Sequence, residues 1–241
     1  MRRRMILAVV GATLALVAGL APAAAGATAT DNGEAAKSAT EILADAEQAT
    51  SQVSSLRLAG TVVDSKQKVS LDIVSSHGAG GGTISANGAA FQIVLVPPAL
   101  YMKGTASTWT KVAGSKAAGQ LFAGKWLQTT TADEDFASFA NLFDVSSMMQ
   151  STSSDGPLTK GPVTSYRGTK AIPLKDAAKA SVAYVAATGK PYVLGMVRTG
   201  AKRGELVFSQ FGTAKVPKAP SHTIDLSQLE QQAGNGSGGS N

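Results

Sequence analysis

Apolar and polar residues alternate most clearly between Ala89 and Val96. Phe91, Ile93 and Leu95 fall on one face of this segment, and a two-residue period of this kind is typical of a strand with one strongly buried face. The strand is expected to end at Pro97-Pro98, because proline has no amide hydrogen to donate to a neighbouring strand. This segment is therefore the predicted centre of a β-sheet.

Short turn signals connect this strand to others on both sides. Asn87-Gly88, a strong hairpin signal, leads directly into it. The glycine-rich stretch Gly78–Gly82 is expected to be a flexible hairpin loop. Connections this short predict an antiparallel meander, since parallel neighbours need longer crossovers. The other strands expected in this half are Leu56–Asp64, Val69–Val74, Thr83–Ala86, Ala99–Lys103 and Thr108–Val112.

A first helix is expected shortly before the meander. Ser38 and Glu41 have the spacing of a capping box, and Ile42, Leu43 and Ala46 begin an apolar stripe at helical intervals. Because the stripe consists of alanines and small aliphatic residues, this helix can lie close against a sheet.

Two further helices are expected after the meander, a short one at Ser115–Phe122 and a longer one at Ala132–Met149. In the longer helix Phe136, Phe139 and Phe143 recur every three or four residues. The acids at its start are favoured there by the helix dipole. Its place between two runs of strands predicts that it covers one face of a curved sheet.

The chain then returns to strand patterns and closes with a short helix at Leu226–Gln231. Strand runs on both sides of an inserted helix predict an α+β fold. A short strand, Lys125–Gln128, is expected between the two helices, and the strands expected after them are Leu158–Val163, Tyr166–Pro173, Ser181–Ala186, Pro191–Thr199 and Glu205–Phe211.

The first 27 residues have the composition of an export signal. Arg2-Arg3-Arg4 precede an apolar run, Met5–Leu20, and a stretch of small residues with Ala-x-Ala cleavage options. Cleavage is expected, and an uncleaved membrane anchor is the alternative. The expected organisation is a signal peptide at 1–27, a polar spacer at 28–37, one domain at 38–231 and a disordered Gly/Ser tail at 232–241.

Cysteine usage and charge narrow the function classes further. The chain has no cysteine, which excludes a lipid anchor on cysteine, disulfides and thiolate metal sites.

Of its 22 basic and 16 acidic side chains, three arginines belong to the export signal, so the remainder carries a net charge of about +3. No dense basic cluster remains to bind nucleic acid. The group Arg198, Lys202 and Arg203 is interpreted as a solvated hairpin turn, with contact to anionic lipid headgroups as the alternative.

The residue types needed for catalysis or metal binding do not converge. His77 and His222 lack a second ligand at a helical or strand spacing. No serine stands in a G-x-S-x-G turn, and the glycine-rich stretch lacks the lysine of a phosphate-binding loop. The sequence predicts neither an enzyme nor a cofactor.

The remaining candidate for a functional site is a set of apolar side chains. A sheet face with Phe91, Ile93, Leu95, Tyr101 and Met102 is opposed by a helical set, and the two together form either a sealed core or the lining of a cavity for acyl chains. The helical set consists of Leu121, Phe122, Phe136, Phe139, Leu142, Phe143, Met148 and Met149.

The order of several short motifs resembles that of the LppX/LprG-type exported lipoproteins of bacteria, which share the fold of the LolA and LolB carriers. Each motif is weakly specific, and their shared order carries the resemblance. They are Ser54–Gly60 after the opening helix, Tyr101–Gly104, Trp109–Val112, Gly124–Leu127 and the hairpin Tyr184–Leu194.

This resemblance implies a curved antiparallel half-barrel that wraps helices around a hydrophobic cavity. Members of that family bind or move lipids in the cell envelope, so the implied function is binding of a lipid or another acyl-chain ligand by an extracytoplasmic monomer, with peripheral membrane contact and no cofactor. An envelope interaction or signalling module with a filled core is the alternative. The ligand-contacting residues then expected are Phe91, Ile93, Leu95, Tyr101, Leu121, Phe122, Phe136, Phe139 and Phe143.

Overall fold

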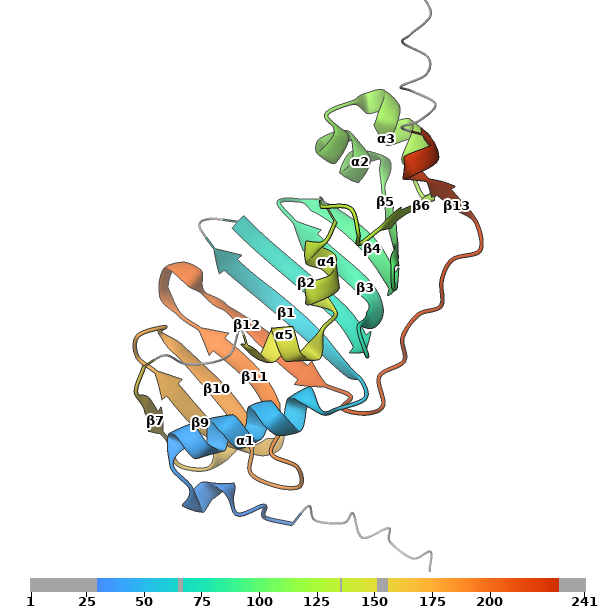
Figure 1. Ribbon diagram of the computed structural model, residues 1–241. Coiled ribbons are helices and arrows are strands. Elements are labelled where there is room, and N and C mark those ends of the chain that lie inside the picture. Colours follow the sequence, from blue (N-terminus) through green and yellow to red (C-terminus); the bar gives the residue numbers. More distant parts are fainter. Residues whose placement is uncertain (1–29, 65–66, 135, 151–155, 230–241) are drawn as a thin grey trace, which may run out of the picture.

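A curved, unclosed sheet dominates the structure, a computed structural model that describes residues 30–64, 67–134, 136–150 and 156–229 (Figure 1). Within these residues thirteen strands form one sheet, in the order β13-β6-β5-β4-β3-β2-β1-β12-β11-β10-β9-β7, with β8 paired to β9. The strands are β1 (Leu56–Asp64), β2 (Gln67–Ser76), β3 (Ala79–Ala86), β4 (Ala89–Val96), β5 (Ala99–Gly104), β6 (Trp126–Thr130), β7 (Leu158–Lys160), β8 (Thr164–Tyr166), β9 (Thr169–Asp176), β10 (Ser181–Ala186), β11 (Val193–Arg198), β12 (Gly204–Ser209) and β13 (Thr223–Asp225).

The predicted meander is confirmed for β1 to β5, which pair consecutively and antiparallel, and β6 pairs with β5 after the intervening helices α2 (Ala106–Ala113) and α3 (Lys116–Phe122). The second run of strands, β9 to β12, is also an antiparallel series. The two runs join where β1 pairs with β12, with Leu58 opposite Phe208. This long-range pairing turns two local meanders into one half-barrel, the architecture expected from the resemblance.

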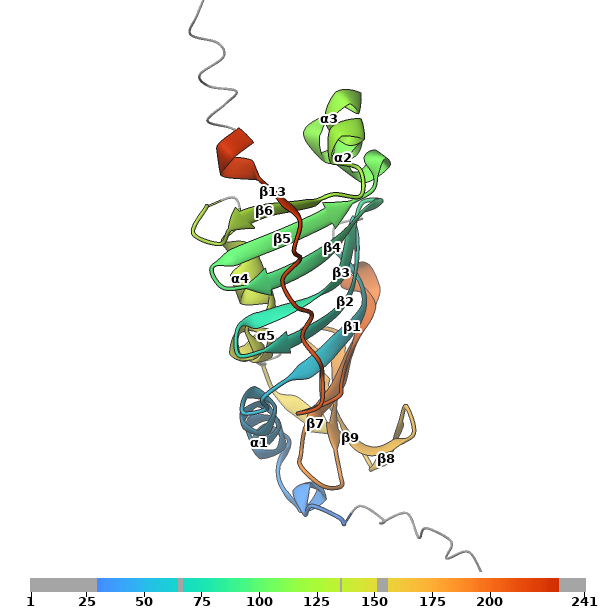
Figure 2. The same cartoon turned by 90° about the vertical axis from the view of Figure 1, so that its right-hand side faces the viewer.

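Three helices cover one face of the sheet: α1 (Ala39–Ser51), α4 (Ser138–Leu142) and α5 (Val145–Gln150) (Figure 2). The capping box predicted for α1 is present, since the Ser38 hydroxyl accepts from the amide of Glu41 and the Glu41 carboxylate accepts from the amide of Ser38. Ile42 and Ala46, both on α1, are fully buried. The apolar stripe therefore faces the sheet, as its composition predicts.

The single long helix expected over Ala132–Met149 is wrong. The chain makes two short helices, α4 and α5, with a break at Phe143-Asp144. The Asp144 carboxylate accepts a hydrogen bond from the amide of Ser147 at 2.7 Å and so caps the start of the second helix. The phenylalanine repeat runs as far as Phe143, and the apolar residues Met148 and Met149 follow it, which is why periodicity alone suggested one helix.

The strand expected at Thr108–Val112 is also wrong, because these residues lie in helix α2 (Ala106–Ala113). The Thr105 hydroxyl accepts from the amide of Thr108, and Gly114 ends the helix in the left-handed conformation with φ of 66°. Helix α3 (Lys116–Phe122) follows as predicted and packs against α2. The two helices form a hairpin beyond the end of β5 (Figure 1).

The glycine-rich stretch is not the flexible loop that was expected, since Ala79 to Gly82 belong to β3. The two faces of this strand are approached closely by other parts of the chain. A Cβ atom on Gly80 would overlap the ring of Phe143 on the helix-covered face, and one on Gly81 would lie 2.9 Å from Cγ of Pro217 on the other. Side chains are excluded here by close packing on both sides.

The C-terminal segment adds a strand that sequence patterns did not predict. Residues 210–222 run past β1 to β5, and β13 then pairs parallel with β6, Ile224 lying opposite Leu127 (Figure 2). The sheet is therefore mixed at this edge. Helix residues 226–229 follow, within the range expected for the closing helix.

Residues near the start of the described chain attach to the second half of the sheet. Asp31 bridges to Thr188, and a 3-10 turn, η1 (Glu34–Ala36), buries Glu34. The Lys37 ammonium donates to Asp45 at 2.5 Å and to Glu34 at 2.8 Å, and these bonds raise the pKa of Lys37. The segment 31–37, expected to be a spacer, thus contacts the fold.

The expected signal peptide at 1–27, the first residues of the spacer and the tail at 232–241 lie outside the described residues. Across residues 30–229, apart from the gaps in that range, no helix is long and apolar enough to cross a membrane.

Candidate functional site

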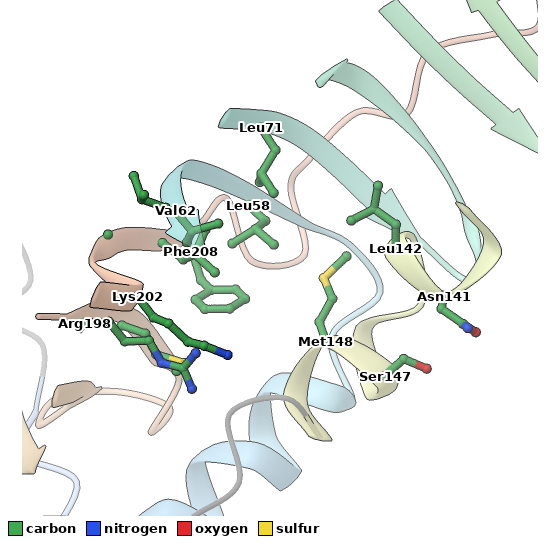
Figure 3. Close-up of a pocket in the computed structure, with 14 residues that line it drawn as sticks. Leu58, Val62, Leu71, Asn141, Leu142, Ser147, Met148, Arg198, Lys202 and Phe208 are labelled. Atoms are coloured by element: carbon green, nitrogen blue, oxygen red, sulfur yellow. The ribbon is translucent and has the colours of Figure 1, made fainter. Parts of the chain in front are cut away.

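A cavity of about 490 Å³ lies between the helix-covered face of the sheet and helices α4 and α5 (Figure 3). Its volume falls in the range of about 300–1,000 Å³ that is usual for small-molecule sites. The described residues that line it are Leu58, Val62, Val63, Leu71, Asn141, Leu142, Ser147, Met148, Met196, Arg198, Lys202, Gly204, Leu206 and Phe208.

The apolar wall of the cavity is built by the period of two in β1 and its neighbours. Leu58 and Val62 share a face of β1, and Gly60 between them carries no side chain. In the register, Leu58 lies opposite Phe208, and Gly60 is flanked by Leu71 and Leu206. Gly60 itself lines a hollow on the other side of the sheet, and a Cβ atom there would overlap the Glu205 carbonyl oxygen, so the aliphatic wall is formed by its neighbours.

The helices supply the opposite wall. Leu142 comes from the end of α4 and Met148 from α5, and both side chains are directed toward the sheet in Figure 3. Methionine adapts its shape to irregular apolar partners more readily than branched residues do. Asn141 and Ser147 add polar atoms on the helical side.

The end of the cavity at β11 is positively charged. Met196 and Arg198 share a face of β11, and Lys202 stands on the following 3-10 turn, η2 (Gly200–Lys202). Arg198 and Lys202 both line the cavity. The Nε atom of Arg198 is buried and has no hydrogen-bond partner among the described residues. The site is therefore a mostly apolar space with a cationic end.

None of the nine residues predicted from sequence to contact a ligand is among the described residues that line this cavity. Phe91 and Phe122 instead pack edge-on against Trp109, with ring centroids 5.0 and 5.9 Å away. This aromatic cluster fixes the α2–α3 hairpin to β4.

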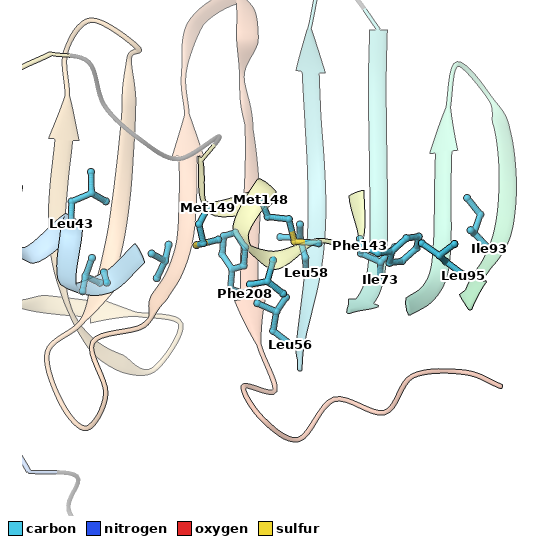
Figure 4. Packing of buried hydrophobic residues seen from close by; sticks show 14 of the residues in the cluster. Leu43, Leu56, Leu58, Ile73, Ile93, Leu95, Phe143, Met148, Met149 and Phe208 are labelled. Atoms are coloured by element: carbon cyan, nitrogen blue, oxygen red, sulfur yellow. The ribbon is translucent and has the colours of Figure 1, made fainter. Parts of the chain in front are cut away.

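Three of the nine residues lie in closely packed core (Figure 4). Ile93, Leu95 and Phe143 are at most 1% exposed. The ring of Phe143 contacts β3 directly at Gly80, so no open space separates α4 from the sheet at this point.

The last four residues are dispersed. Tyr101 lies opposite Val94 in the register and therefore on the other face of the sheet from Ile93. Leu121 is 52% exposed on α3. Phe136 and Phe139 have ring centroids 6.5 Å apart, and Phe136 lines a separate cavity of about 160 Å³ beside β6 and Leu226.

Two members of the predicted apolar helical set, Leu142 and Met148, do line the cavity of about 490 Å³. The wall residues on β1, β2 and β12 were not identified, although their alternation was visible in the sequence. Alternation shows which side chains share a face of a strand, but not where the sheet and its covering helices leave a space between them. The aromatic residues were predicted to line a cavity because they are large, but large side chains also fill space.

A polar cluster lies on the opposite face of the sheet. Arg167 binds the Glu205 carboxylate through Nε and Nη2 at 3.1 and 2.8 Å, and the Tyr166 hydroxyl donates to the same carboxylate at 2.8 Å. The Arg167 hydrogen bond lowers the pKa of Glu205. Burial, followed by the bond to Glu205, raises the pKa of Tyr166 to about 12.

This cluster has a structural role. It links the β8–β9 hairpin to β12, and the Tyr166 ring stacks on Tyr184 with centroids 4.1 Å apart. Within the described chain, no three His, Cys, Asp or Glu side chains converge on a point that would hold a metal ion.

Comparisons with solved structures identify the fold. No protein-family model matches the chain, and no curated protein matches it in sequence. Among solved structures, LprF from Mycobacterium bovis is 14% identical, with a TM-score of 0.53 over 75% of this chain and 96% of that one. The lipoprotein LppX from Mycobacterium tuberculosis is 12% identical, with a TM-score of 0.49 over 74% of this chain and 98% of that one. The chain therefore has the fold of the LppX/LprG-type lipoproteins, as the order of its motifs indicated.

Proposed function

We propose that this protein binds a hydrophobic molecule with an acyl chain, in the cavity between β1, β2, β11 and β12 and helices α4 and α5. The observation that carries the proposal is the cavity itself, a mostly apolar space of about 490 Å³ between the sheet and its covering helices. Its place on the concave face agrees with the function implied by the resemblance to envelope lipid carriers.

The energy of chain burial is sufficient for useful affinity. Each buried methylene contributes about 0.8 kcal/mol, so ten of them contribute roughly 8 kcal/mol before the cost of association. The proposed role is binding or carriage, not catalysis, because none of the described residues that line the cavity is a histidine, an aspartate or a glutamate that could act as a base. We further propose that the protein acts as an extracytoplasmic monomer after export, in contact with a membrane at the time of ligand exchange.

The test is native mass spectrometry of the exported protein from its own host, followed by organic extraction and lipid analysis. A stoichiometric co-purifying lipid is expected. Leu142→Trp, which fills the cavity, should abolish lipid retention without loss of folding. Val112→Trp is the matched control, because Val112 is 59% exposed on the α2–α3 hairpin and away from the cavity.

A second candidate function is an envelope interaction module, and one feature favours it. Val112 and Leu121 are 59% and 52% exposed on the α2–α3 hairpin, an apolar pair of the kind that protein partners cover. A bare mass, with no lipid taken up on incubation, would contradict ligand binding and favour this second function.

A further inference from the structure

The cationic end of the cavity defines the chemical class of the ligand, an inference that rests on the proposed function. Arg198 ends β11 and Lys202 stands on η2, the turn that follows it. In Figure 3 the two side chains extend in the same direction, into the space lined by Phe208. Arg198 is partly buried and Lys202 is exposed, and together they place two positive charges at one end of a space whose other lining residues are mostly apolar.

No carboxylate is present among the described residues that line the cavity. The acid nearest in the register, Glu205, follows Gly204, which pairs with Arg198, and its side chain therefore projects from the opposite face. There it is bound by Arg167 and Tyr166. Asp176 lies on the same face as Arg198, two strands away across Ser181. Its carboxylate accepts from the amide of Lys179 and does not line the cavity.

The guanidinium of Arg198 is incompletely satisfied by the residues that the structure describes. Its Nε atom is buried without a hydrogen-bond partner in the described chain. A buried donor of a charged group is costly to leave unbonded, and the guanidinium presents its donors in a planar fork that matches carboxylate and phosphate oxygens. An acidic group that reached this end of the cavity would satisfy the fork.

We propose that the ligand is an amphiphile with an acidic headgroup, phosphate or carboxylate. The headgroup binds Arg198, with Lys202 adding positive charge, and the chain extends along Leu58, Phe208 and Met148 toward Leu142. The sequence suggested that Arg198, Lys202 and Arg203 together form a solvated turn. In the proposed complex only Arg198 and Lys202 face the ligand, whereas Arg203 lines a separate hollow on the other side of β12.

The test compares two ligands with the same chain, hexadecyl phosphate and hexadecanol, below the concentrations at which they aggregate. The wild type should bind the phosphate more tightly by about tenfold or more, the effect of one charge-assisted hydrogen bond. Arg198→Gln should lower the affinity for hexadecyl phosphate more than the affinity for hexadecanol, and so remove this preference. Arg203→Gln, which makes the same change of charge outside the cavity, should preserve it. Thermal melts establish that both variants are folded. If Arg198→Gln does not fold, Arg198→Lys replaces it. This variant keeps the positive charge but removes the planar guanidinium, and it should weaken the preference for the phosphate.

Equal binding of both ligands by the wild type would overturn the headgroup assignment and leave the proposed function intact. Equal losses in the two glutamine variants would also overturn it, because they would reveal a general charge effect. If inorganic phosphate alone displaced hexadecyl phosphate, the site would be one for a free anion and not for an amphiphile. Failure of the wild type to bind either ligand would contradict the proposed function itself.

Discussion

The hydroxyl of Ser75, on β2, donates a hydrogen bond to the main-chain carbonyl oxygen of Phe143, at the end of α4. Both residues are fully buried. Ser75 pairs in the register with Gly80, whose lack of a side chain accommodates the Phe143 ring. Two neighbouring strands thus fix one residue of the covering helices, by its backbone and by its ring.

Replacing Ser75 with alanine should reduce the free energy of unfolding by about 1–3 kcal/mol, because the Phe143 carbonyl would remain buried without a donor. Denaturant unfolding measures the change. Ser76→Ala is the matched control, since its hydroxyl donates to the Ser54 carbonyl at an exposed position and water can replace it. Equal losses in the two variants would contradict the role given to burial.

Gly80→Ala should destabilise the fold by about 1–3 kcal/mol through overpacking. The new Cβ atom would overlap the Phe143 ring and the Val74 carbonyl oxygen. Because displacement of Phe143 moves the junction of α4 and α5, ligand binding in the neighbouring cavity should also weaken. Gly156→Ala is a suitable control, since its Cβ atom would make only an ordinary contact with Ala178 at 3.7 Å. A fully stable Gly80→Ala protein would show that α4 is not held against β3.

Phe91→Ala should loosen the α2–α3 hairpin and expose Trp109. The Phe91 ring contacts Trp109 edge-on, and Trp109 is only 6% exposed in the native fold. In a Trp126→Phe background Trp109 is the sole tryptophan, and its fluorescence should shift to longer wavelength. The expected loss of stability is about 2 kcal/mol, below that for a fully buried phenylalanine. An unchanged emission maximum would place the hairpin anchor elsewhere.

Tyr166 should ionise late in an alkaline titration. Burial and the bond to Glu205 raise its pKa to about 12 from an ordinary 10.0. Since the pKa is raised, the stabilisation is complete below pH 10 and is lost as the pH rises toward 12. Tyrosinate absorbance should therefore contain a late component that Tyr166→Phe removes. If the late component persisted in the variant, another tyrosine would be responsible.

Glu205 should make the fold sensitive to acid. Its pKa is lowered by Arg167 from an ordinary 4.5, so its stabilisation is present above that pH and is lost as the pH falls through the lowered value. The difference in stability between the wild type and Glu205→Gln should shrink on acidification from neutral pH. The effect should be modest, because the pair is partly exposed and screened by solvent. A difference that did not depend on pH would indicate that the ion pair contributes nothing.

The sequence by itself determined the local structure of most of the sheet. Period-two alternation around Ile93 and the Asn87-Gly88 turn were sufficient to predict the β3–β4–β5 meander, because each strand pairs with its neighbour in the chain. The capping box at Ser38 similarly predicted the start of α1. Local rules failed where short polar residues cap helices, at Thr105 and at Asp144, since the same residues are also common in turns and loops.

Only the tertiary structure decided where the fold is filled and where it is open. Phe143 follows a helical pattern in the sequence, but its ring meets a glycine on β3 and seals the core there. Leu58 and Phe208 follow ordinary strand patterns, but they line the cavity because β1 pairs with β12 across about 150 residues. The position of Arg198 was likewise decided only by the tertiary structure. Its sequence context is that of a solvated turn, and only the pairing of distant strands brings its guanidinium to the end of an apolar cavity, because packing between distant segments is not encoded in local periodicity.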